Sequence, residues 1–189
     1  MYPEVKVEAL FDLTQTAAAE LLNRFEYPWE ALPHIKEFIL QLGATLPADK
    51  FDQPAQDVWI SKEAVVAPTA YIGGPCIIMP GSEVRHCAYI RTSALVGEHC
   101  VVGNSTELKN VILFNNVQVP HYNYVGDSIL GYCSHMGAGS ITSNIKSDKS
   151  DVKIYGLDEP IETNLIKVGA LVGDYVEVGC NSVLNPGAV

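Results

Sequence analysis

The chain has few basic residues, no long apolar run and no paired cysteines. Its 189 residues include 12 Lys and Arg against 22 Asp and Glu, which gives a formal net charge of −10. Phosphate-rich partners are bound through clustered cations, so this balance excludes a nucleic-acid partner. No stretch of about 18 apolar residues occurs, and the N-terminus is acidic where a leader would be basic and then apolar. We therefore expect no membrane partner and a cytoplasmic protein.

The cysteines are odd in number and form no CxxC pair. A disulfide framework or a zinc ribbon needs such pairing, so neither is indicated and we expect reduced thiols. The five are Cys76, Cys87, Cys100, Cys133 and Cys180.

What the sequence has instead is an internal repeat of six residues. Branched aliphatic residues recur at this interval nine times in succession, and a small residue stands two positions before each of them from Val66 onward. The series continues through two five-residue steps and resumes near the C-terminus. Its members are Ile60, Val66, Ile72, Ile78, Val84, Ile90, Val96, Val102, Leu108, Leu113, Val119, Val125, Leu130, Met136, Ile166, Val172, Val178 and Leu184.

A period of six fits neither a helix, which repeats near 3.6 residues, nor a single strand, which repeats at two. It indicates a solenoid of short strands and turns, with the aliphatic residue inside and the small residue at a tight turn. The pattern resembles the hexapeptide-repeat family, in which three hexapeptides form one coil of a left-handed parallel β-helix. The handedness is implied by that resemblance alone. Eighteen residues per coil predict about six coils in a mainly β fold, stacked at about 4.8 Å.

The repeat divides the chain into two expected parts, an N-terminal helical cap over residues 1–55 and a β-helix over residues 56–189. A polar excursion at about 145–163 interrupts the β-helix and reads as a protruding hairpin with Gly156 and Asp158 at its tip. At the C-terminus the repeat is still in phase, so we expect that the natural chain continues or that a partner covers this edge.

Two helices are expected in the N-terminal part, near 14–25 and near 33–42. Asp12 or Thr14 is a suitable N-cap for the first, and Gly43 a suitable end for the second. An apolar face in this part would either cover the open first coil or dock another protein. It consists of Trp29, Leu32, Ile35, Phe38, Ile39 and Leu42.

Arg91 and Lys109 each follow a core aliphatic residue by one position and are eighteen residues apart. We therefore expect them one above the other on adjacent coils. Two cations so placed repel unless an anion or solvent separates them, and a phosphate suits an arginine beside a lysine. The alternative is two solvated side chains with acidic neighbours such as Glu107.

His121 takes the same place in its hexapeptide as His86, two coils away. Two coils correspond to roughly 9.5 Å, which is too far for one metal ion to bridge. No three-histidine site within a subunit is indicated, which disfavours a metal-dependent hydratase, and we expect no bound metal. A single histidine with an ordinary pKa can instead accept a proton from an attacking amine or hydroxyl.

Residues 91–144 carry a more specific pattern. An arginine is followed by a lysine eighteen residues later and a histidine twelve after that, then by "HYNYVGD", "MGAGSIT" and an asparagine. This stretch resembles the acetyltransferase half of the bifunctional glucosamine-1-phosphate acetyltransferase/N-acetylglucosamine-1-phosphate uridyltransferase family. The later repeats, with the hairpin, resemble the C-terminal β-helix of related sugar-phosphate nucleotidylyltransferases.

The resemblance implies an acetyltransferase that takes acetyl-CoA and an amino-sugar phosphate such as glucosamine 1-phosphate. It implies His121 as the general base, and Cys180 stands where the family has a serine near the coenzyme. The family is a trimer with coenzyme A between neighbouring β-helices, so a homotrimer is implied. The substrate-binding residues would be Arg91, Lys109, Tyr124 and Asn144.

Three departures from the family favour a rival reading, a non-catalytic trimeric β-helix with a regulatory or scaffold role. His135 replaces an asparagine of the family pattern, Cys180 replaces the serine, and the 189 residues contain no counterpart of the family's C-terminal arm. A glycine-rich nucleotide-binding segment of the uridyltransferase type is also absent, so uridyl transfer is not expected.

Overall fold

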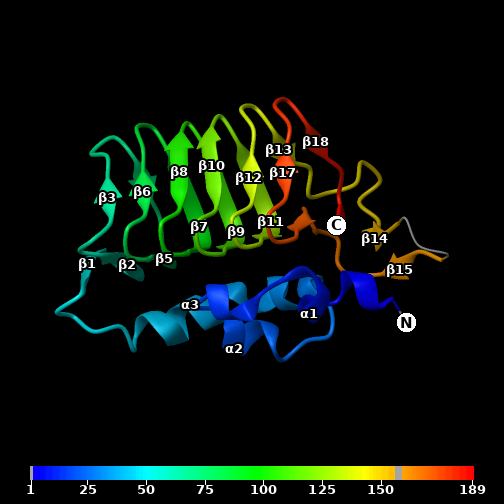
Figure 1. The fold of residues 1–189 in the computed structure, drawn as a ribbon, viewed down its shortest axis with the longest axis horizontal. Coiled ribbons are helices and arrows are strands. Elements are labelled where there is room, and N and C mark those ends of the chain that lie inside the picture. Colours follow the sequence, from blue (N-terminus) through cyan, green and yellow to red (C-terminus); the bar gives the residue numbers. More distant parts are fainter. Residues whose placement is uncertain (1, 156–158) are drawn as a thin grey trace.

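A computed structural model describes residues 2–155 and 159–189, which form a parallel β-helix with helices along one side (Figure 1). The mainly β solenoid expected from the repeat is therefore confirmed. One face is a six-stranded parallel sheet in the order β17-β12-β10-β8-β6-β3, which agrees with the expected number of coils.

The other two faces are joined, because β7, β9 and β11 run around a corner of the solenoid and take part in both. The strands of the coils are β2 (Val58–Ser61), β3 (Val65–Val66), β4 (Tyr71–Ile72), β5 (Cys76–Ile78), β6 (Glu83–Val84), β7 (Tyr89–Val96), β8 (Val101–Asn104), β9 (Glu107–Leu113), β10 (Gln118–His121), β11 (Tyr124–Leu130), β12 (His135–Met136), β13 (Ile141–Thr142), β16 (Leu171–Val172), β17 (Glu177–Val178) and β18 (Val183–Leu184).

The core of the solenoid is built from the repeating aliphatic residues. In the middle coils these side chains are fully buried, as at Ile90, Leu108 and Val125. Ile166 was expected in the same series, but it is 51% exposed. The reason is that the chain re-enters the coil only at Val168, whose N–H donates to the Asn144 carbonyl at 3.1 Å.

The excursion therefore runs from about 145 to 167, four residues beyond its expected end, and Ile145 pairs with Lys167 at its base. Its two strands, β14 (Lys153–Ile154) and β15 (Ile161–Glu162), are antiparallel, as the hairpin reading requires. The expected tip residues, Gly156 and Asp158, lie outside the described residues.

The N-terminal segment packs along a side of the solenoid and does not close its first coil as expected (Figure 1). α3 lies against β5, β7 and β9, and η3 lies against β11. The edge of the first coil is instead paired by an antiparallel strand, β1 (Phe51–Ala55), on β2. A six-residue period identifies the residues of the core but not the side of the solenoid on which a separate helix packs. The placement of the N-terminal helices could therefore not be predicted from it.

The expected helices are present in shorter form. The second is α3 (Ile35–Gly43), preceded by the 3₁₀ helix η3 (Pro28–His34). The first breaks into η2 (Leu13–Gln15), which the Asp12 side chain caps by accepting from the Thr14 N–H at 3.0 Å, and α2 (Ala19–Leu22). η1 (Pro3–Val5) and α1 (Val7–Leu10) precede them. Among the described residues, no helix combines the length and the apolar character that crossing a bilayer requires.

Close stacking of coils makes Gly103 a sensitive position. A Cβ built there would overlap the Pro120 carbonyl of the next coil, whereas a Cβ at Gly179 would meet its nearest neighbour at 3.7 Å. We expect Gly103→Ala to lower the free energy of unfolding by about 1–3 kcal/mol, the usual cost of overpacking, while Gly179→Ala has little effect. Urea denaturation of both variants measures this, and equal losses would contradict the described stacking.

Candidate active site

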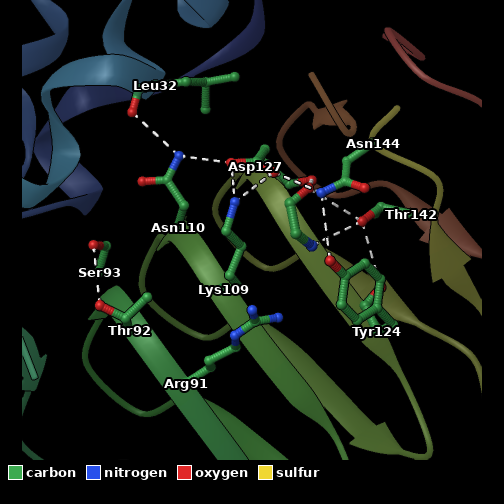
Figure 2. A network of polar contacts seen from close by, with 12 residues as sticks. Leu32, Arg91, Thr92, Ser93, Lys109, Asn110, Tyr124, Asp127, Thr142 and Asn144 are labelled. Carbon is green, nitrogen blue, oxygen red and sulfur yellow. Dashed lines mark hydrogen bonds and ion pairs between the residues drawn. The ribbon is translucent and has the colours of Figure 1, made fainter. Parts of the chain in front are cut away.

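A buried carboxylate, Asp127, lies at the centre of the polar residues that the sequence singled out (Figure 2). Its side chain is 6% exposed and accepts both contacts of the Lys109 ammonium, at 2.9 and 3.0 Å. It also accepts from the side-chain amides of Asn110 at 2.9 Å and Asn144 at 2.5 Å. A buried carboxylate needs such donors, because burial without partners is costly.

Tyr124 is the outer member of this group. Asn144 Nδ2 points at its hydroxyl at 3.4 Å and at Asp127, so the amide connects the phenol to the carboxylate. Burial of Tyr124, and then the negative charge of Asp127, raise the pKa of the phenol above its ordinary value. The hydroxyl therefore stays protonated at neutral pH and remains a hydrogen-bond donor.

We refer to Lys109, Asn110, Tyr124, Asp127 and Asn144 as the Asp127 cluster. Three of its members are residues that the resemblance assigns to substrate binding. The other two, Asp127 and Asn110, were not assigned a role from the sequence. The signal for Asp127 was present, because it follows Lys109 by the same eighteen residues that separate Lys109 from Arg91.

Arg91 and Lys109 lie on neighbouring strands but are not stacked one above the other as expected. A bulge between Ile90 and Thr92 shifts the register, so Lys109 pairs with Thr92. The Arg91 side chain is 54% exposed and its guanidinium lies 3.5 Å from Glu107. Each cation therefore has a carboxylate partner, and the two form no unpaired cationic pocket. Arg91 is the more accessible of the two for an anionic ligand.

His121 ends β10, on the strand that precedes β11 and Tyr124. Its backbone is fixed, because its N–H donates to Asn123 Oδ1 at 3.0 Å and its carbonyl accepts from Gly139 N–H at 3.0 Å. Asn123 is itself buried, and its amide donates to the Gly137 carbonyl at 2.8 Å. The imidazole is exposed and, within the described residues, forms no hydrogen bond that would commit either nitrogen.

The other histidines and the cysteine singled out from the sequence form no hydrogen bond or ion pair with the Asp127 cluster among the described residues. His86 Nδ1 is 2.6 Å from Thr69 Oγ1, and His135 Nδ1 is 2.6 Å from Glu177 Oε2. Cys180 is exposed near the last coil, after β17. In the described part of the chain, no three histidine, cysteine or acidic side chains gather in an arrangement that could hold a metal ion.

The arrangement can bind and orient a polar ligand. Arg91 supplies an accessible cation, Tyr124 a protonated hydroxyl, and Lys109 and Asn144 supply N–H groups held by Asp127. These donors suit the oxygens of a phosphate or a sugar. An imidazole with no committed hydrogen bond can accept a proton from an attacking group.

The chain is similar to curated bifunctional enzymes. It is 34% identical over 168 residues to the bifunctional protein GlmU of Methanococcus maripaludis strain C5, across 87% of this chain and 40% of that protein. It is 32% identical over 130 residues to a bifunctional sugar-1-phosphate nucleotidylyltransferase/acetyltransferase of Sulfurisphaera tokodaii, across 69% of this chain and 32% of that protein. These relatives confirm the resemblance of residues 91–144. The chain spans less than half the length of either relative.

A solved structure with a similar course is the acetyltransferase domain of PglB from Neisseria gonorrhoeae in complex with acetyl coenzyme A. The identity is 17%, the match covers 69% of this chain and 52% of that one, and the TM-score is 0.35.

A protein-family model matches most of the solenoid, including the Asp127 cluster and His121. Residues 72–189 match the family model described as the GMPPB C-terminal domain, and the chain belongs to that family.

Proposed function

We propose that the chain is an acetyl-CoA-dependent acetyltransferase that acts on the amine of an amino-sugar phosphate, with glucosamine 1-phosphate as the substrate. The observation that carries the proposal is the Asp127 cluster, in which the carboxylate holds Lys109 and Asn144, and the Asn144 amide connects it to Tyr124. The similarity to bifunctional proteins with an acetyltransferase activity supports the same reaction class. The product would serve nucleotide-sugar synthesis.

In this proposal Arg91 contacts the phosphate from the exposed side, and Lys109 and Asn144 contact it or the sugar from the Asp127 side. Tyr124 donates its hydroxyl to a sugar or carbonyl oxygen, which its raised pKa permits at neutral pH. Holding the substrate at several points converts the attack on the thioester into an effectively intramolecular step.

His121 is the general base in this mechanism. It takes a proton from the sugar amine as the nitrogen forms a bond to the thioester carbonyl carbon of acetyl-CoA. The tetrahedral intermediate then collapses, the carbon–sulfur bond breaks, and coenzyme A leaves as the thiolate and takes up a proton. The exposed imidazole of His121 is accessible to such a substrate.

We also propose that the active unit is a homotrimer, with coenzyme A bound between neighbouring β-helices and Cys180 close to it. The exposed position of Cys180 is compatible with this placement. Light scattering should give three times the mass of one chain, and a monomer or dimer at assay concentration would contradict the proposal.

The proposed reaction is tested by incubating the chain with acetyl-CoA and glucosamine 1-phosphate and separating the products. The N-acetylated sugar phosphate should form, and glucosamine without its phosphate should react much more slowly. Product separation is preferable to thiol detection, because Cys87 and Cys180 are exposed and would react with a thiol reagent. Cys76 and Cys100 would not interfere, since burial raises the pKa of each to about 12.

The rival function, a regulatory or scaffold β-helix, is favoured by one observation. Lys109 and Arg91 are both paired with carboxylates, so neither is held as an unpaired charge awaiting an anion. Lack of acetylated product from any amino-sugar phosphate, in a chain that still assembles, would favour this rival.

A further inference from the structure

The Asp127 cluster has a contact that reaches out of the solenoid to the N-terminal segment. Asn110 Nδ2 donates to Asp127 Oδ1 at 2.9 Å and to the Leu32 carbonyl in η3 at 3.2 Å (Figure 2). These two acceptors are 95 residues apart in the chain. One amide group therefore joins the buried carboxylate to the helices that cover the side of the solenoid.

The backbone at this corner explains why an asparagine can do this. Asn110 and Asp127 have φ angles of 56° and 48°, in the left-handed region where asparagine and aspartate are tolerated better than other side chains. They occupy equivalent positions on β9 and β11, between pairs of residues that are in register. Their side chains thus meet at the same corner of adjacent coils.

The division of contacts on Asp127 shows what Asn110 controls. Oδ1 accepts from Asn110 and Lys109, and Oδ2 accepts from Lys109 and Asn144. Asn110 and Asn144 thus hold opposite oxygens of the carboxylate. Because both of the Lys109 ammonium contacts are to this carboxylate, its position follows the orientation that the two amides impose.

We propose that Asn110 is a positioning residue. Its amide bridges the Asp127 carboxylate and the Leu32 carbonyl and so fixes the orientation of the carboxylate. That orientation sets where Lys109 and Asn144 present their donors to a bound sugar phosphate. The N-terminal segment is then part of the substrate site through one backbone carbonyl, and not only a cover for the solenoid. This inference rests on the proposed function.

The test replaces Asn110 by glycine, which accepts the left-handed backbone and removes the whole side chain with its amide. Asn116→Gly is the matched control, since Asn116 has a φ of 61° and, among the described residues, its side chain forms no hydrogen bond. We expect Asn110→Gly to raise KM for glucosamine 1-phosphate roughly tenfold, less than the ~10² cost of a misplacement of 1 Å. KM for acetyl-CoA should stay the same. Asn110→Gly should unfold at a lower temperature than Asn116→Gly, because it removes two hydrogen bonds, so KM is measured at a temperature where both variants are folded.

A second readout does not depend on activity. In protein labelled with ¹⁵N-lysine, the ammonium signal of Lys109, assigned with Lys109→Arg, should exchange slowly with water in the native chain and in Asn116→Gly. It should exchange faster in Asn110→Gly. If the chain transfers no acetyl group, the proposed function fails, and the Lys109 signal still decides the positioning. Identical Lys109 signals and identical KM values in the two glycine variants would overturn the proposal.

Discussion

Replacing His121 by alanine should slow acetyl transfer by about 10²–10⁴-fold, the usual contribution of a general base. KM for glucosamine 1-phosphate should change little, because the donors of the Asp127 cluster remain in place. Stability should also change little, since the imidazole is exposed and only the backbone of His121 is hydrogen-bonded within the described residues. The measurement is the rate of N-acetylated product formation at saturating concentrations of both substrates.

His86→Ala is the matched control for this experiment. His86 has the same place in its repeat on the same face of the solenoid, two coils away, and it lies near Thr69 and Cys87. Its loss should leave the transfer rate unchanged. Equal rates for the native chain and His121→Ala would remove His121 from the mechanism, and equal losses in both variants would point to a general effect on the fold.

Replacing Asp127 by asparagine should lower the free energy of unfolding by about 3 kcal/mol, because it breaks a buried ion pair by removing one partner. The change keeps the shape of the side chain and the tolerance for a φ of 48°. It leaves the Lys109 ammonium without a carboxylate and sets an amide against the amides of Asn110 and Asn144. We expect the lower part of the range for buried pairs, because the Lys109 side chain is 21% exposed.

The control for this prediction is Glu162→Gln, which breaks the Lys153–Glu162 pair on the exposed hairpin. Exposed pairs of this kind contribute about 0–1 kcal/mol, so this variant should unfold close to the native chain. Urea unfolding of both variants at neutral pH gives the comparison. A loss for Asp127→Asn no larger than that for Glu162→Gln would show that the cluster is not a stabilising centre.

The repeat predicted the coils well because its period marks the residues whose side chains point into the core. Small and aliphatic residues at fixed places leave few ways to stack the chain, so burial at Ile90 and Val102 follows from their positions. The prediction that Ile166 is buried was wrong, because the six-residue count was extended across the excursion. An aliphatic residue can fall in phase by chance where the chain has not yet returned to the coil.

Three members of the Asp127 cluster, Lys109, Tyr124 and Asn144, were singled out from the sequence, but Asn110, Asp127 and the contacts of the cluster were not. The eighteen-residue interval placed Arg91 and Lys109 on neighbouring strands, yet a one-residue bulge changed which residues are in register. The partner of Lys109 is Asp127 on the next strand, and the sequence interval alone could not distinguish that contact from an unpaired cation. The link from Asn110 to Leu32 depends on where the N-terminal helices pack, which no local pattern specifies.

The proposed reaction transfers an acetyl group from acetyl-CoA to the amine of a sugar phosphate. The most direct measurement uses [1-¹³C]acetyl-CoA with glucosamine 1-phosphate and follows the carbonyl signal by NMR as the chain is added. We predict that the thioester signal is replaced by an amide signal on the sugar phosphate, at a rate that falls sharply in His121→Ala. A thioester signal that persists in the presence of the assembled native chain would contradict the proposal.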